Sequence, residues 1–170
     1  MDVNEEIVRV WLQEKGFLVR ERLKFKVKGA RKAPGYADVD LIGYRLSDRK
    51  YVAVDISAWM TENITLSYLK AGSDNRHRLL KITDPEYREA IRKYLGVAND
   101  DQYEIWLVVS FISKIQYETV KNELLKYVDE VFEFPEIMNF LIEKIKENPK
   151  MSRETESLQT IRALVLCGLL

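Results

Sequence analysis

The sequence has very little of the residue types that form cross-links and metal-binding clusters. Its 170 residues include a single cysteine, Cys167, and a single histidine, His77. One cysteine excludes a disulfide within the chain and a Cys/His zinc site, and it is typical of proteins in a reducing compartment. One histidine leaves no material for a His-rich metal site. We therefore expect a cytoplasmic protein.

An excess of charge of either sign is also missing. Lys and Arg number 27 and Asp and Glu number 27, so no overall field attracts the protein to DNA or to anionic lipid. Contact with nucleic acid would need a local basic patch. The most apolar stretch, residues 161–170, falls short of the about 20 residues that a membrane-spanning helix needs. The acidic start, residues 1–6, does not resemble a signal peptide.

The composition suits one globular domain over residues 1–170. It is 46% hydrophobic and 32% charged, and a chain of this length can bury a core without disulfides or metals. The pattern predicts a core over about residues 3–134 and C-terminal helices over about residues 135–170. Helical and period-two spacings predict a helix at 5–15, strands at 17–27, 37–44 and 51–58, a two-piece helix at 75–94, a strand at 103–113, a helix at 115–127, a strand at 130–134, and helices at 135–146 and 157–170.

This order of elements predicts an α/β fold. Three consecutive strands early in the chain favour a meander, and the later alternation of helices and strands favours strands joined across a covering helix. The strand within residues 103–113 is the most apolar, so we expect it inside the sheet with both faces covered. The expected architecture is a mixed central sheet flanked by helices.

Acidic residues interrupt two of the early strands. Period-two alternation predicts that Asp38 and Asp40 share one face of their strand, with Val39 and Leu41 on the other, and Asp55 lies in the next strand. Carboxylates within apolar strands are costly to bury unless they are paired, solvated or bound to a cation. Two on neighbouring strands could share one Mg²⁺. The alternative is that they line a solvated face and pair with Lys or Arg.

These residues carry a resemblance to a known family. Glu5 in the first helix, the stretch ADVDLIG at 37–43 and the stretch VAVDIS at 52–57 resemble the PD-(D/E)XK nuclease superfamily. The pattern is most similar to that of small predicted endonucleases and archaeal Holliday-junction resolvases. It spans roughly residues 5–58. The resemblance implies a restriction-endonuclease-like core of order α-β-β-β-α-β-α-β, with extra helices at the C-terminus.

The resemblance also implies a function and a set of site residues. The function is hydrolysis of DNA phosphodiesters that depends on Mg²⁺ or Mn²⁺, which activates a water molecule and stabilises developing charge. Asp40 and Asp55 match the metal ligands, and the backbone carbonyl of Ile56 would be a third. Glu5 matches the acid of the first helix, with Glu6 as the alternative.

The sequence departs from the family at Ser57, which stands where the motif has a lysine. A serine hydroxyl carries no charge to neutralise the transition state, and loss of one such group costs roughly 100- to 1,000-fold in rate. A cation from the following segment, Lys70, Arg76 or Arg78, could replace it. Otherwise the protein is an inactive DNA-binding or scaffold subunit with the nuclease fold. A third hypothesis is an interaction protein with no role in nucleic-acid chemistry.

Two further features bear on partners. Residues 20–32 hold seven Lys or Arg and one Glu, a local charge of +6, and they predict a DNA-binding surface that includes Lys24, Lys26, Lys28, Arg31 and Lys32. The alternative is an edge strand that uses Lys against aggregation. The apolar C-terminal end, Val165 to Leu170, could pack on its own domain or form a homodimer contact.

Overall fold

The computed structural model describes residues 2–28, 34–58, 63–150 and 155–169. The α-helices and strands follow in the predicted order, with short 3-10 helices between some of them. They are α1 (Val3–Glu14), β1 (Phe17–Lys28), β2 (Pro34–Arg45), β3 (Lys50–Ser57), α2 (Asp74–Leu79), η1 (Lys81–Thr83), α3 (Pro85–Leu95), η2 (Asp100–Gln102), β4 (Glu104–Val109), η3 (Lys114–Gln116), α4 (Tyr117–Leu124), β5 (Glu130–Glu133), α5 (Phe134–Glu147) and α6 (Glu156–Leu166).

The five strands form one mixed sheet in the order β1-β2-β3-β4-β5. The first three pair antiparallel as a meander, and β4 and β5 are added parallel to β3. Parallel neighbours need a crossover connection, and α2 with α3, and then α4, supply these. The predicted α/β fold with a mixed sheet flanked by helices is therefore confirmed.

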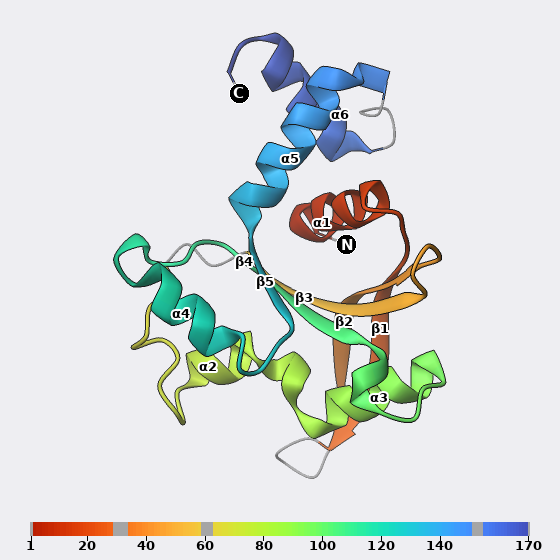
Figure 1. The fold of residues 1–170 in the computed structure, drawn as a ribbon, viewed down its shortest axis with the longest axis vertical. Helices are drawn as coiled ribbons and strands as arrows, with labels where there is room; N and C mark the ends of the chain where they lie inside the picture. Colours follow the sequence, from red (N-terminus) through yellow and green to blue (C-terminus); the bar gives the residue numbers. More distant parts are fainter. Residues whose placement is uncertain (1, 29–33, 59–62, 151–154, 170) are drawn as a thin grey trace.

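Helix α1 lies on one face of the sheet, and α5 and α6 pack on α1 on the same side (Figure 1). Helix α1 begins with a capping box between Asp2 and Glu5, and its apolar side includes Val8 and Leu12, which are completely buried. On the sheet, Trp106 of β4 packs against Trp11 of α1 at a ring-centroid distance of 6.0 Å. This aromatic contact fixes the first helix over the middle of the sheet.

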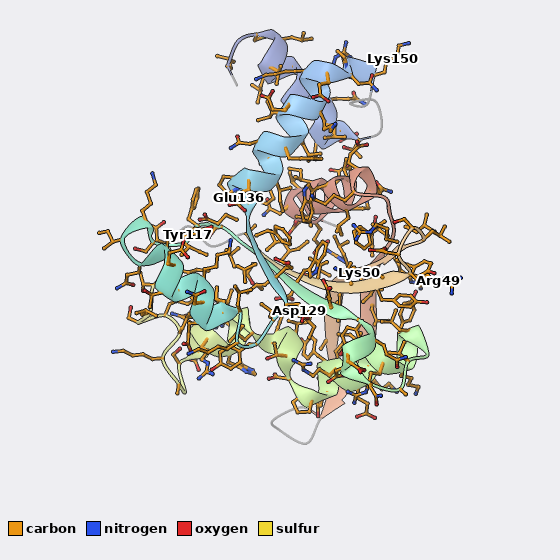
Figure 2. All side chains as sticks on the ribbon, in the orientation of Figure 1. Arg49, Lys50, Tyr117, Asp129, Glu136 and Lys150 are labelled. Carbon is orange, nitrogen blue, oxygen red and sulfur yellow. The ribbon has the colours of Figure 1, made fainter. Side chains whose placement is uncertain are left out.

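Helices α2, α3 and α4 cover the opposite face (Figure 1). Strand β4 contributes to both sides, with Trp106 and Val108 facing α1 and Ile105, Leu107 and Val109 facing α4. As predicted, it is an interior strand buried on both faces. Figure 2 shows that side chains fill the space between the sheet and each helical layer.

The C-terminal helix α6 packs on the α1 side through Leu158 and Ile161, which are buried, whereas Leu166 and Leu169 are exposed. The homodimer contact stays a prediction. Within the described residues, no helix combines the length and apolar character that crossing a membrane requires.

Candidate active site

The site begins at a break in the pairing of β1 and β2. Pairs Glu21–Leu41 and Leu23–Val39 are in register, but Arg22 and Asp40, which the register places between them, do not pair. Arg22 has a positive φ of 48°, a backbone conformation that is rare for a residue with a long side chain. The regular ladder is therefore interrupted at one point in both strands.

The interruption reverses which face each strand buries. Leu41 packs under α1, whereas Val39, two residues earlier, packs on the opposite face with α3 and α4. In β1 the change is the same, since Val19 lies on the α1 side and Leu23 on the other. The predicted alternation, with Val39 and Leu41 on one face, is wrong. An irregular residue in each strand shifts the period by one.

Asp40 lies where β2 separates from β3. The β2–β3 ladder ends at the pair Leu41–Val54, and beyond it the carboxylate Oδ2 of Asp40 accepts a hydrogen bond of 2.7 Å from the backbone N–H of Ile56. The Asp40 side chain thus replaces a backbone partner. Because N–H and C=O of a strand residue point to the same neighbour, the Ile56 carbonyl faces the same gap.

Asp55 is completely buried on the face that Ala53 shares, beneath α2 and α3. Neither of its carboxylate oxygens has a well-aligned hydrogen bond from any residue that the structure describes. Burial of a carboxylate costs several kcal/mol, and hydrogen bonds usually offset part of this cost. Asp55 therefore stays charged only with the help of a nearby cation.

That cation is Lys81, at the start of η1. Its Nζ lies 3.1 Å from Oδ1 of Asp55 and forms an ion pair with it. Lys81 is bracketed by the buried Leu80 and Ile82, which hold η1 against the sheet. A cation between apolar neighbours is the sequence signal that could have identified it.

The three cations predicted for this role are not the ones found there. Arg76 instead donates a hydrogen bond of 2.7 Å to the hydroxyl of Tyr127, on the α4 side. Lys70 and Arg78 are exposed to solvent. Among the described residues, the ion pair with Asp55 is made by Lys81, which the sequence pattern did not single out.

Burial and mutual repulsion perturb both acids. Burial raises the pKa of Asp40 to about 6, against the opposing effects of Lys81 and the Ile56 N–H, while Glu5 and Asp38 raise it further. Burial, followed by the charge of Asp40, raises the pKa of Asp55 to about 7. Burial alone would lower the pKa of Lys81, but the two carboxylates outweigh it and raise that pKa above its ordinary value. Two acids and one cation thus form a single electrostatic unit.

Glu5 and Ser57 adjoin this unit. Glu5 is in the first turn of α1, close enough to Asp40 to affect its charge, and its carboxylate is held by Arg22. Glu6, the alternative, accepts a hydrogen bond from Ser157 of α6. Ser57 is buried at the end of β3, next to Val109 of β4.

The residues suit a hard divalent cation in part. Asp40 and Asp55 offer carboxylate oxygens, two of them without hydrogen bonds, and the Ile56 carbonyl adds another ligand of the kind that Mg²⁺ takes. Within the part of the chain described, no group of three or more His, Cys, Asp or Glu is arranged to hold a metal. Glu5, whose carboxylate pairs with Arg22, is not grouped with these two acids.

The predicted basic surface is described in part. Lys24 and Lys26 are exposed on β1, across from Asp38 and Tyr36 of β2. Lys28 ends β1, while Arg31 and Lys32 lie outside the described residues. The role of this surface in DNA binding stays a prediction.

A separate cavity of about 450 Å³ lies beyond the C-terminal ends of β4 and β5. Tyr117 at the start of α4 and Glu136 at the start of α5, both labelled in Figure 2, line it. The acids that line it accept hydrogen bonds from the backbone: Glu133 from Ile112 N and Glu136 from Glu133 N. The perturbed acids therefore mark the other site as the candidate.

Comparison of the sequence with models of protein families and with curated proteins gave no match. The resemblance to the nuclease superfamily consequently rests on the residues themselves.

Proposed function

We propose that the protein is a metal-dependent nuclease of the PD-(D/E)XK type in which Lys81 replaces the missing motif lysine. The observation that carries this proposal is the 3.1 Å ion pair between Lys81 Nζ and Asp55 Oδ1. The charge that Ser57 cannot supply is thus provided by a different element, beside the same carboxylate. The helix–strand–strand–strand order and the raised pKa values of both acids support it.

The chemistry follows from the residues at the site. Asp40, Asp55 and the Ile56 carbonyl would hold Mg²⁺ or Mn²⁺. When bound, the ion would supply a water of lowered pKa and stabilise charge on the phosphate. The ammonium of Lys81 can orient the attacking water and neutralise charge that develops on the phosphoryl oxygens. DNA is the proposed substrate, and the free thiol of Cys167 agrees with a cytoplasmic setting.

A second candidate is a DNA-binding or scaffold subunit that has kept the fold and lost the chemistry. One observation favours it, namely that Glu5 is bound to Arg22 and is not grouped with the other acids. Such a subunit would bind DNA in a salt-dependent way and would not cleave it.

Cleavage assays separate the two candidates. The wild-type protein would be incubated with plasmid, single-stranded and branched DNA at several Mn²⁺ concentrations, beside Asp40→Asn. We expect metal-dependent cleavage by the wild type and none by Asp40→Asn, because the variant loses a ligand but keeps an oxygen that can accept from Ile56 N–H.

Two outcomes would count against the nuclease proposal. Identical cleavage by the two proteins would show that the activity does not depend on Asp40 and would remove the catalytic hypothesis. DNA binding without cleavage at any Mn²⁺ concentration would favour the second candidate.

A further inference from the structure

Arg22 has three unusual features. Its backbone is left-handed, it stands at the register position opposite Asp40, and its side chain reaches α1. A left-handed conformation is unfavourable for an arginine within a strand. Such a cost at this position calls for a function that a regular strand would not provide.

The side chain of Arg22 donates two hydrogen bonds to the carboxylate of Glu5. Nε donates to Oε2 at 3.2 Å and a terminal nitrogen donates to Oε1 at 3.4 Å. Glu5 is further held by the backbone N–H of Asp2, at 3.3 Å. Its side chain is only 13% exposed, whereas that of Arg22 is 42% exposed. The acid is thus enclosed, and the cation that holds it faces solvent.

We propose that the Arg22–Glu5 pair is a latch that couples the binding of a divalent cation to the binding of a phosphodiester. In the closed state Arg22 engages both carboxylate oxygens of Glu5, so they are not available to a metal ion. When a phosphate draws the guanidinium away, Glu5 is free to become the third carboxylate of the metal site. This inference rests on the proposed function.

The charges at the site determine whether the closed or the open state is favoured. Glu5 repels Asp40 even while Arg22 holds it. Loss of the guanidinium would leave this repulsion uncompensated, so without a bound cation the closed pair is the favoured arrangement. A divalent ion reverses this preference, because a third carboxylate then gains attraction. A phosphate offers Arg22 a new bidentate partner in exchange for Glu5. Each ligand favours the open state, so each strengthens the binding of the other.

The first test is a calorimetric titration with Mn²⁺ alone. The variant Arg22→Asn removes the guanidinium, and Asn tolerates a positive φ, so the irregular backbone is kept. We expect Arg22→Asn to bind Mn²⁺ about five-fold more tightly than the wild type, the upper range for release of an exposed ion pair. In a Glu5→Gln background the same substitution should gain less, since no carboxylate is released.

A matched control is provided by Arg9→Gln. Arg9 on α1 pairs with Glu21 on β1 at 3.2 Å, so it joins the same two elements through the neighbouring ion pair. Its removal loosens the contact between these elements without freeing Glu5. Arg9→Gln should therefore bind Mn²⁺ as the wild type does.

The second test measures coupling with DNA. A fluorescently labelled duplex with phosphorothioate linkages, which resist hydrolysis, would be titrated with protein with and without Mn²⁺. In the wild type we expect Mn²⁺ to tighten DNA binding. In Arg22→Asn, DNA binding should weaken and its enhancement by Mn²⁺ should shrink by at least half.

The outcomes separate the latch from the function on which it rests. If the wild type binds Mn²⁺ and Arg22→Asn binds it equally or more weakly, the latch is overturned while the metal site stands. The latch is likewise overturned if Arg9→Gln gains as much affinity as Arg22→Asn. If no variant binds Mn²⁺, both the proposed function and the latch are overturned.

Discussion

Acidic side chains accept hydrogen bonds from the backbone of the sheet in two regions, and the effects on stability are opposite. Beside β4 and β5, Asp129 accepts a hydrogen bond of 2.7 Å from Ile105 N, and Glu133 accepts one of 2.6 Å from Ile112 N. Between β2 and β3, Asp40 accepts one of 2.7 Å from Ile56 N, but it is buried next to Asp55. Asp129 is exposed and marked in Figure 2 just before β5.

Some acids therefore stabilise the fold, and others destabilise it. Asp129 satisfies an N–H that a strand end would leave without a partner, and the residue is exposed to solvent. Asp40 and Asp55 repel each other. Among the described residues neither oxygen of Asp55 has a well-aligned hydrogen bond, and Lys81 offsets its charge only as an ion pair with Oδ1. Buried acids with raised pKa values are typical of functional sites.

The largest expected effect concerns Lys81 and activity. Lys81→Met keeps the hydrocarbon of the side chain and removes the charge, so we expect the cleavage rate to fall by about 100- to 1,000-fold, the cost of losing one transition-state donor. Initial rates on the best DNA substrate would measure it. Lys70→Met, which removes an exposed lysine in the segment before α2, should retain the wild-type rate. Equal rates for both variants would exclude Lys81 from the chemistry.

Asp55→Asn should stabilise the metal-free protein. The amide is close in shape and carries no charge to bury, and Lys81 can turn toward solvent because its side chain is 32% exposed. We expect the free energy of unfolding at pH 8 to rise by roughly 2 kcal/mol. Urea denaturation in the presence of a chelator would measure the change. A loss of stability would mean that the acid supports the fold.

The same acid should make stability depend on pH. Its folded pKa, about 7, lies above the ordinary value of 3.8, so the folded state binds the proton more tightly than the unfolded state. The resulting stability is fully present below about pH 4 and is lost as pH rises through 7. The stability of wild type minus that of Asp55→Asn should fall across this range in urea titrations. A flat difference would contradict the raised pKa.

The smallest effect is expected at the other region. Asp129→Ala removes the acceptor for Ile105 N, and we expect the free energy of unfolding to fall by about 1 kcal/mol. Asp129→Asn keeps an acceptor oxygen and should lose less. If Asp129→Ala were as stable as the wild type, the claim that Asp129 stabilises the fold, in contrast to Asp55, would be contradicted.

The sequence predicted the fold well because its signals are local. The β-branched run Val52, Val54, Ile56 and the apolar stretch around Trp106 identify strands regardless of their neighbours. The order of helices and strands then limits how the sheet can be connected. Asp40 and Asp55 were selected because acids are unusual in such strands.

The details that depend on packing could not be predicted from the sequence. A left-handed backbone usually coincides with Gly or Asn, and Arg22 gives no such signal. The reversal of burial between Val39 and Leu41 follows from that irregularity, so strict alternation misplaced Val39. Lys81 reaches Asp55 only because α2 and η1 fold back on the sheet, which no short motif encodes.

The most direct test of a metal site between Asp40 and Asp55 is a calorimetric titration of Mn²⁺ into three proteins. The wild type and Asp129→Asn should each bind one Mn²⁺ with the same affinity, and Asp55→Asn should show no heat of binding. Equal binding by Asp55→Asn and the wild type would contradict the account, because the buried acids would then be a feature of the fold alone.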